Sequence, residues 1–593
     1  MNWTQVINPF NNIALSAMVA LTPILFIFWA LVVKKMQGYK ASLIATGIAI
    51  VIAITVYGMP VKLALLSTSN GALYGLFPIC WIVITALFLF NITVESGQFE
   101  IIKHFMASIT SDRRLQALLI AFSFGSFLEG TAGFGAPVAI TAAMLVGLGF
   151  NPLYAAGICL IANTAPVAFG SIGIPITVAS QVSSIPEMAI SQMVGRTLPI
   201  LSVMLPFYLV VLMCGLKKTK EVLPAILVSG VSFAVIQWAC SNFLGPSLPD
   251  ILAGIGSIMS LIIFLKFWKP KHVWRFANEP SSSLIQVNKY TTGQILRAWS
   301  PFILLTIMIV AWGLQPVKDV FNSFGKIEFQ IPGIHNTIIG SDGKLIPHVF
   351  KFNYLSAAGT AILISAIIAL PLIGLAFRDG IRIFMLTLKQ LKFPIITVAS
   401  VLGFAYLVND SGIILTLASV LANTGSFFPF FAPVLGWLGV FITGSDTSSN
   451  ALFSKLQAVT ATSIGVDPVV TVAGNVSGGV IGKMISPPSI AVAAAAGNLV
   501  GKESELFRFT VKHSFIMLIF ICFIVTAQAY LFSWIIPEYE LLSSKTVSLH
   551  QNLGTGYWYI LVLAIILIAI VLAIKLINSK NKAANKQETS SKN

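Results

Sequence analysis

Long apolar runs separated by short polar segments are the feature of this sequence that most restricts its fold. A helix needs about 20 apolar residues to cross the hydrocarbon core of a bilayer. Only 9% of the residues are charged, whereas soluble domains carry about 25%. We therefore predict an all-α polytopic membrane protein. Candidate spans lie near residues 13–33, 41–59, 72–92, 196–214, 222–241, 249–267, 298–314, 353–374, 393–409, 514–535 and 556–576.

The formal net charge of +16 indicates how these spans are oriented and does not indicate a nucleic-acid partner. The basic residues form short clusters between apolar runs, as expected of cytoplasmic loops. This distribution predicts an outside N-terminus, an external loop over 315–352 and a cytoplasmic tail over 577–593. The clusters that carry the prediction are Lys34/Lys35/Lys40, Lys217/Lys218/Lys220 and Lys266/Lys269/Lys271/Arg275.

The sequence carries no signature of catalysis or cofactor binding. Its five cysteines lack C-x-x-C spacing and its six histidines form no H-E-x-x-H pair, so neither a disulfide framework nor a metal site is predicted. The segment Gly478–Met484 resembles a phosphate-binding loop, but only three residues separate Gly478 from Gly482. Met484 also replaces the Ser or Thr that would hold Mg²⁺. We expect neither an enzyme nor an ATP-driven pump, and no cofactor.

Two parts of the chain resemble each other. Glu95-Ser-Gly97 recurs as Asp410-Ser-Gly412, and residues 124–130 (FGSFLEG) parallel residues 438–444 (LGVFITG) at a nearly constant offset. The charge clusters place the first copy's Glu95 inside and the second copy's Asp410 outside. The two copies are therefore predicted to cross the membrane in opposite senses, an arrangement common in secondary transporters.

Each copy is predicted to contain a re-entrant hairpin followed by a broken helix. Residues 116–128 and 430–442 are too short to span as helices. They run into the turns 130–137 and 443–450, and return segments follow to about 150 and 464. Irregular backbone at that depth has to line a cavity or bind a ligand. The predicted helix breaks are Asn163–Pro166 with Gly170–Pro175, and Asn475–Gly479 with Ser486–Pro488.

These turns and breaks supply candidate residues for binding a small anion, because helix ends at polar turns offer N–H groups and a favourable dipole. Glu129 and Asp446 lie in the turns, where burial would ease protonation, so they are the proton-coupling candidates. Lys455 and Lys483 could neutralise a substrate carboxylate, pair with Asp446 or form a structural ion pair. Packing through small residues is the alternative role for the glycines. The candidate substrate-binding residues are Gly130, Thr131, Gly133, Gly135, Asn163, Ser445, Thr447, Ser448, Asn450 and Asn475.

Several long motifs resemble the L-lactate permease family of bacteria. They are FGSFLEGTAGFGAPVAI at 124–140, NTAPVAFG at 163–170, TGSDTSSNALF at 443–453, GGVIGKMISP at 478–487 and GKESELFRFTVKH at 501–513. The resemblance implies secondary active uptake of L-lactate, and of D-lactate or glycolate, with protons across the bacterial plasma membrane. It also implies kinship with an ion-transporter superfamily whose inverted hairpin repeats often lie beside a dimerising scaffold, which allows a homodimer.

The resulting hypothesis is a single membrane domain with about 13 transmembrane helices and two re-entrant hairpins. Repeat 1 covers about 41–241, linking helices about 249–314 and repeat 2 about 353–576. The anion would lie near the midplane between the two turns. One alternative keeps this fold and couples transport to Na⁺ through broken-helix carbonyls with Asn163 and Asn475. The other is a membrane-embedded enzyme or a passive channel, and the missing catalytic residues argue against the enzyme.

Overall fold

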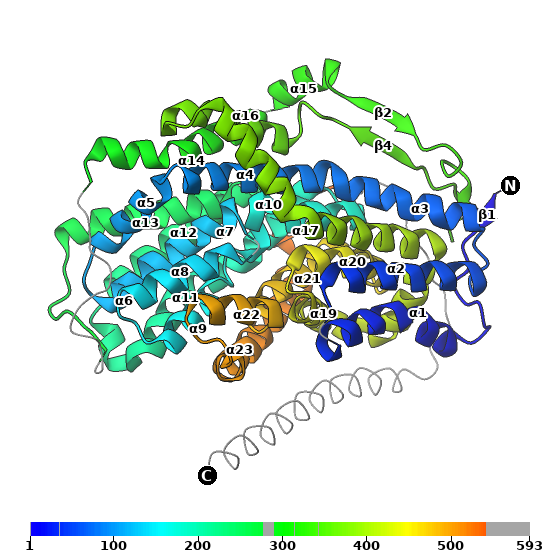
Figure 1. Ribbon diagram of the computed structural model, residues 1–593. Coiled ribbons are helices and arrows are strands. Elements are labelled where there is room, and N and C mark those ends of the chain that lie inside the picture. The colour runs from blue at the N-terminus through cyan, green and yellow to red at the C-terminus, as the bar shows by residue number, and fades with distance from the viewer. Residues whose placement is uncertain are drawn as a thin grey trace, which may run out of the picture.

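The structure is a bundle of membrane-length helices, as the apolar runs predict. The computed structural model describes residues 2–34, 36–133, 135–276, 290–313, 315–341 and 343–540. Within these residues 11 helices are long and apolar enough to cross a membrane, or up to 12 if one bent pair counts as a span. Most of the long helices run side by side in Figure 1. The all-α polytopic class is confirmed, whereas the predicted span 556–576 and the tail 577–593 lie outside the described residues.

The first half of the chain follows the predicted spans with one addition, helix α3. This helix was not predicted because residues 67–70 are polar, yet Ser67 and Asn70 are buried and α3 packs against α17. The helices are α1 (Ile13–Phe28), α2 (Gly38–Thr55), α3 (Val61–Tyr74), α4 (Trp81–Glu95), α5 (Gln98–Ser108), α6 (Arg113–Gln116), α7 (Gly125–Thr131), α8 (Ala136–Gly147), α9 (Pro152–Ala162), α10 (Gly170–Ser183), α11 (Glu187–Lys220), α12 (Leu223–Phe243) and α13 (Pro249–Phe267).

The described residues of the second half continue the helical bundle. Its helices are α14 (Thr292–Gly313), α15 (Gln315–Phe324), α16 (Ala358–Ile373), α17 (Phe377–Ser411), α18 (Ile413–Leu421), α19 (Phe428–Thr443), α20 (Asp446–Ser463), α21 (Pro468–Lys483), α22 (Pro487–Ala496) and α23 (Glu503–Tyr530).

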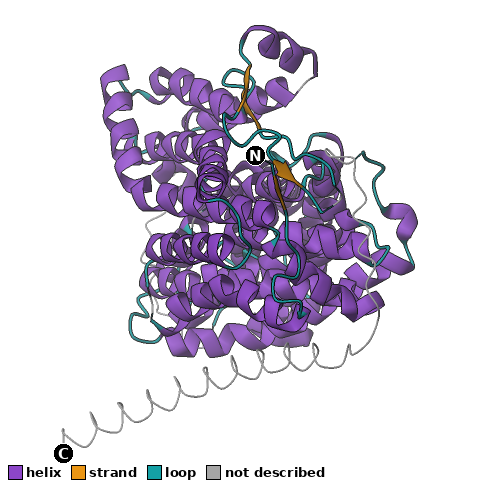
Figure 2. Ribbon diagram, turned by 90° about the vertical axis from the view of Figure 1, so that its right-hand side faces the viewer, coloured by secondary structure: helices purple, strands orange, loops and turns teal. Residues whose placement is uncertain are grey.

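Short strands lie with the N-terminus at one end of the bundle, which faces the viewer in Figure 2. Strand β1 (Trp3–Thr4) pairs in parallel with β3 (Ile338–Ile339), with Trp3 opposite Ile338. Strand β2 (Ile327–Gln330) pairs antiparallel with β4 (Val349–Phe352), with Ile327 opposite Phe352. The segment 315–352, predicted to be a loop, therefore contains α15 and strands.

The two predicted turns are tighter than the sequence indicated. In the first, Gly130 and Thr131 still belong to α7, and Ala132, Gly133 and Gly135 lie outside the helices. In the second, only Gly444 and Ser445 separate α19 from α20, so the polar residues 446–450 are the first turns of a helix. The first helix–turn–helix unit therefore runs from α6 to α8, and the second consists of α19 and α20. Whether either unit re-enters the membrane stays a prediction.

The first predicted helix break is confirmed, and the second is wrong at Asn475–Gly479 but confirmed at Ser486–Pro488. Helices α9 and α10 are bent by 64° across the break near residues 163–166. Helix α21 instead runs unbroken through Asn475–Gly479 and ends at Lys483. Its glycines serve packing, because a Cβ on Gly478 would lie 1.9 Å from the carbonyl oxygen of Pro433 in α19. The interruption falls at residues 484–486, before α22.

The two similar tripeptides end helices at opposite ends of the bundle. Both have a left-handed glycine, Gly97 with φ 74° and Gly412 with φ 87°. Glu95 lies 3.7 Å from Arg382 near the start of α17, whereas Asp410 lies at the end of α17 and its carbonyl accepts from Gln5. At 1.5 Å per residue, these two ends of α17 are about 40 Å apart.

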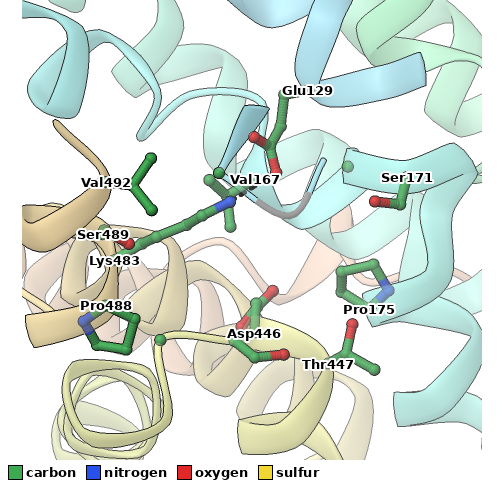
Figure 3. Close-up of a pocket in the computed structure, with 14 residues that line it drawn as sticks. Glu129, Val167, Ser171, Pro175, Asp446, Thr447, Lys483, Pro488, Ser489 and Val492 are labelled. Atoms are coloured by element: carbon green, nitrogen blue, oxygen red, sulfur yellow. Dashed lines mark hydrogen bonds and ion pairs between the residues drawn. The ribbon is translucent and has the colours of Figure 1, made fainter. Parts of the chain in front are cut away.

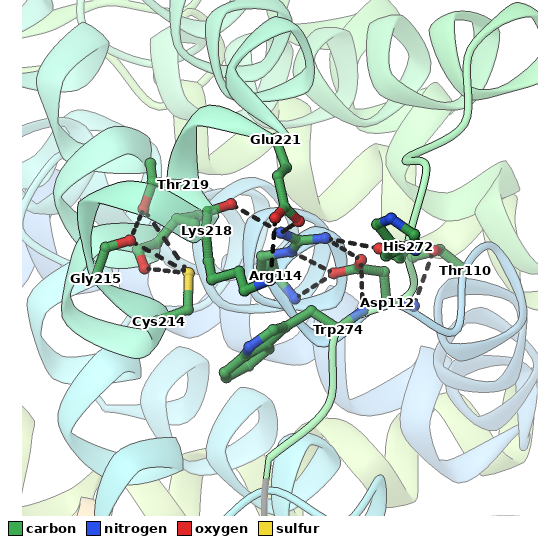
Figure 4. Close-up of polar contacts among 11 residues, drawn as sticks. Thr110, Asp112, Arg114, Cys214, Gly215, Lys218, Thr219, Glu221, His272 and Trp274 are labelled. Carbon is green, nitrogen blue, oxygen red and sulfur yellow. Dashed lines mark hydrogen bonds and ion pairs between the residues drawn. The ribbon is translucent and has the colours of Figure 1, made fainter.

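A buried arginine secures the base of the first helix–turn–helix unit (Figure 4). The Arg114 side chain is fully buried and contacts Asp112 Oδ2 at 2.7 Å and Glu221 Oε2 at 2.9 Å. It also donates to the carbonyl oxygens of Lys218 and His272. These contacts join the start of α6 to the α11–α12 connection and to the segment after α13. Hydrogen bonds of Glu221 with Arg114 and Lys218 lower the pKa of the Glu221 carboxyl.

We expect Arg114→Met to lower the thermal unfolding midpoint of the detergent-solubilised protein, because removing one partner of a buried ion pair costs about 3–5 kcal/mol. Tryptophan fluorescence during heating measures the midpoint. Lys218→Met is the matched control, because its side chain is 52% exposed and exposed pairs contribute little. Equal midpoints for the two variants would contradict the anchoring role of Arg114.

A histidine holds the strand segment against the end of α17. His348 Nε2 lies 3.0 Å from Asp410 Oδ2, and Ser67 Oγ donates to the same carboxylate oxygen. Burial lowers the pKa of His348, but the Asp410 carboxylate and the backbone carbonyls of Ile346 and Ile334 raise it, so the net pKa is raised above its usual value. The charged histidine is therefore favoured in the docked segment.

We expect the stabilising effect of His348 to depend on pH. Because the folded-state pKa is raised, the contribution is fully present below the unfolded value of about 6.5 and is lost as pH rises through the folded value. The difference in unfolding midpoint between wild type and His348→Asn should shrink from pH 5.5 to pH 9. The exposed His272, replaced in His272→Gln, should leave the wild-type pH profile unchanged.

Candidate functional site

A cavity of about 180 Å³ lies where the two helix–turn–helix units and the two helix interruptions meet (Figure 3). The first unit contributes Glu129 and Gly135, and the second contributes residues 444–447. The interruptions border the cavity through residues 167–175 and 483–492. A cavity of about 150 Å³ holds a benzene molecule. This space therefore suits a ligand of about six non-hydrogen atoms.

A buried ion pair forms one wall of the cavity. Lys483 Nζ, at the end of α21, lies 2.6 Å from Glu129 Oε1 in α7. Asn163, at the break after α9, donates from Nδ2 to the other carboxylate oxygen of Glu129 at 2.9 Å. Glu129 is only 3% exposed. The pair joins elements that are far apart in the sequence, and Figure 3 shows the lysine reaching across the cavity.

The opposite wall carries a carboxylate without a hydrogen bond. Asp446 is the first residue of α20, after the N-cap Ser445, whose Oγ accepts from the Ser448 amide. It is 3% exposed, and no described residue donates a hydrogen bond to either oxygen. The Asn450 amide lies nearby but donates to the Pro175 carbonyl. An ionised carboxylate in this position lacks a partner, so a proton or a ligand would relieve it.

The break beside α10 contains a short left-handed turn. Ser171, Ile172 and Gly173 have φ values of 47°, 61° and 77°. Such backbone costs about 1–3 kcal/mol at each non-glycine residue and is concentrated at functional sites. Ser171 lines the cavity and its Oγ donates to the carbonyl of Ala132 in the first turn. The strained turn therefore connects the first break to the first helix–turn–helix unit.

The structure brings six of the predicted site residues to the cavity. They are Glu129, Gly135, Ser445, Asp446, Thr447 and Lys483. Their role in transport stays a prediction, but their meeting at one cavity agrees with the arrangement that the sequence indicated.

The remaining predicted residues do not line the cavity. Thr131 donates back to the carbonyl of Phe127 in its own helix, and a Cβ on Gly133 would lie 1.9 Å from Ser171 Oγ, so Gly133 is in close contact with Ser171. The predicted substrate-binding role of both residues stays a prediction. Asn475 donates to Asn450 Oδ1 and holds α21 against α20. The predicted residues outside the lining are Gly130, Thr131, Gly133, Asn163, Ser448, Asn450, Asn475 and Lys455.

Of the alternatives given for the two core lysines, the structure shows an ion pair for Lys483, and its partner is not Asp446. Lys483 pairs with Glu129 and not with Asp446. Lys455 lies in α20 outside the cavity lining, and Asp410 is its electrostatic neighbour. Only Lys483 is positioned to meet an anion in the cavity.

Sequence reasoning missed eight of the fourteen residues that line the cavity. Ser171, Pro175 and Pro488 were recognised as parts of helix breaks but not as site residues, and the apolar residues carry no chemical signal of their own. The missed lining residues are Val167, Gly170, Ser171, Gly444, Pro175, Pro488, Ser489 and Val492. A buried acid near the cavity, Asp250 in the first turn of α13, was also missed, because Asp is common at helix starts.

Comparisons with known proteins give one consistent result. A family model described as L-lactate permease matches residues 16–532. The chain is 56% identical over 563 residues to an L-lactate permease of Bacillus subtilis (strain 168), covering 91% of this chain and 100% of that protein. It is 52% identical over 554 residues to the glycolate permease GlcA of Escherichia coli (strain K12), covering 90% and 99%. It is 50% identical over 548 residues to the L-lactate permease of the same strain, covering 90% and 100%.

The buried Glu129–Lys483 ion pair should be important for the stability of the folded protein. We expect Lys483→Met to destabilise the protein by about 3–5 kcal/mol, because it leaves the Glu129 charge buried without its partner. The double variant Glu129→Gln/Lys483→Met should recover most of the loss, since it removes both charges. Thermal unfolding in detergent compares the stability of the wild type, the single variant and the double variant. A double variant no more stable than Lys483→Met would show that the two residues do not act as a pair.

Proposed function

This chain belongs to the L-lactate permease family, and from that membership we propose that it takes up L-lactate, with D-lactate or glycolate as further substrates, together with protons. The chain is a multi-pass membrane protein of a bacterial transporter family and not an enzyme, since its relatives are permeases. We place the substrate in the cavity between residues 129–135 and 444–447.

The observation that carries this proposal is the charge arrangement of the cavity. Among the residues that line it, Lys483 is the one base, and Glu129 already pairs with it. Asp446 adds a second acid with no hydrogen-bond donor. A substrate anion would bring further negative charge, which a low-dielectric site tolerates only if a proton accompanies it. Glu129 and Asp446 are therefore our candidates for carrying that proton.

The remaining lining suits a short 2-hydroxy acid. A lysine ammonium has three N–H donors, so Lys483 can contact Glu129 and a substrate carboxylate together. Three hydroxyls line the cavity and can bond the 2-hydroxyl group: Thr447, Ser171, which donates to Ala132 and can still accept, and Ser489, which accepts from Ser486 and can still donate. Val167 and Val492 offer an apolar wall for a methyl group, which a glycolate molecule would leave unused.

Alternating access through two inverted repeats is part of the proposal, with repeat 1 over about 41–241 and repeat 2 over about 353–576. It is supported by the position of the two similar tripeptides at opposite ends of α17 and by the meeting of both turns at one cavity. We propose an outside N-terminus and a cytoplasmic C-terminus, because the basic clusters would then lie inside. A homodimer is the assembly that the family resemblance allows.

We expect purified protein in liposomes to accumulate lactate when the outside is made acidic in the absence of Na⁺. Asp446→Asn should abolish accumulation, because the amide cannot carry a proton. The matched control is Asp467→Asn, at the N-cap of α21 and outside the cavity lining, where Asn caps a helix equally well. Labelled lactate inside the vesicles is the measurement.

Three outcomes would contradict parts of this proposal. Accumulation driven by a Na⁺ gradient alone would favour the Na⁺-coupled alternative. Equilibration without accumulation under any gradient would indicate a passive channel. Wild-type accumulation by Asp446→Asn would remove Asp446 from the mechanism and leave Glu129 as the candidate.

A further inference from the structure

An acid that the cavity does not include is buried beside Glu129. Asp250 lies in the first turn of α13 and is 1% exposed. Within the described part of the chain neither of its carboxylate oxygens has a hydrogen-bond partner. The amide of Gln237 lies close by, but it donates to the Ala165 carbonyl and accepts from Ser202.

The position of Asp250 couples it to the ion pair of the cavity. Gly130, the residue after Glu129, approaches α13 so closely that a Cβ on it would lie 2.9 Å from Asp250 Cβ. Glu129 and Lys483 are the charged groups that interact with the Asp250 carboxyl. Asp250 therefore lies behind the helix end that carries Glu129, within the field of the same lysine but not in contact with the space for substrate.

The ionised and the neutral form of Asp250 differ in free energy at this position. An ionised carboxylate with no partner in an apolar interior costs several kcal/mol. The N-terminus of α13 returns at most about 2 kcal/mol in partly buried geometries. With Lys483 paired to Glu129, the neutral acid is the form that fits the arrangement seen here. A carboxylate at this position would need Lys483 as its partner, in competition with Glu129.

On the basis of the proposed proton-coupled uptake, we propose that Asp250 is a proton-carrying residue of the transport cycle, separate from the substrate site. A proton that reaches Asp250 through the cavity neutralises its carboxylate. Lys483 then has one ionised acid fewer in its field, while it stays paired with Glu129, and can accept a substrate carboxylate. After the anion leaves on the cytoplasmic side, the same proton leaves Asp250, and Lys483 is shared between Asp250 and Glu129 until the next proton binds.

The test separates proton coupling from substrate binding. Wild type, Asp250→Asn and the control Asp379→Asn are reconstituted in liposomes. Asp379 is likewise an acid in the first turn of a long helix, α17, but it is not buried in the core. One assay measures accumulation of labelled lactate under an imposed proton gradient. The other measures exchange of labelled for unlabelled lactate at equal pH, which needs no net proton movement.

We expect Asp250→Asn to lose accumulation, to retain exchange, and to show exchange that no longer responds to external pH. The control Asp379→Asn should behave as wild type in both assays. Accumulation by Asp250→Asn at the wild-type level would overturn the inference. Loss of both accumulation and exchange would also overturn it, because the side chain would then serve more than the proton.

The same two assays distinguish a wrong role for Asp250 from a failure of proton-coupled uptake itself. If the wild type exchanges lactate but does not respond to a proton gradient, proton-coupled uptake itself is wrong, and the role of Asp250 falls with it. If the wild type accumulates lactate and Asp250→Asn does so equally, only the role of Asp250 is wrong.

Discussion

The contact between Lys483 and Glu129 is the interaction on which the arrangement of the site depends. The two residues come from different halves of the chain, and their atoms lie 2.6 Å apart in a buried setting. Two buried charges are stable only when they are well paired, so this contact requires α7 and α21 to end at the same point. The cavity, the meeting of the two turns and the electrostatics of the neighbouring acids all follow from that requirement.

Close approach of helix backbones accommodates the acids. A Cβ on Gly170 would lie 2.7 Å from Glu129 Oε1, and one on Gly479 would lie 2.1 Å from Asp446 Oδ1. A Cβ on Gly130 would likewise lie 2.9 Å from Asp250 Cβ. Each acid is thus set against a glycine of another segment, so the small residues of this chain do more than pack helices. They leave room for carboxylates that have few hydrogen bonds.

The ends of the bundle are held by contacts of a different kind. At one end Arg114 is enclosed by carboxylates and backbone carbonyls (Figure 4). At the other, His348 fastens the strand segment to Asp410. Both clusters are fully paired, in contrast with Asp446 and Asp250. Paired charges fix elements in place, whereas the unpaired acids near the cavity are the groups whose protonation can change during transport.

The sequence by itself determined the class of fold, most of the spans and the family. Hydropathy and charge distribution are local properties, and long motifs such as residues 124–140 identify relatives directly. It also located the turns, because glycine and polar residues interrupt apolar helices. Only the tertiary structure decided that α21 passes unbroken through Asn475, that Lys483 pairs with Glu129 and that Lys455 does not reach the cavity. The tertiary structure also placed Asp250 behind Glu129, close to Gly130. Such pairings depend on which helix faces meet, and no local pattern in the chain records that.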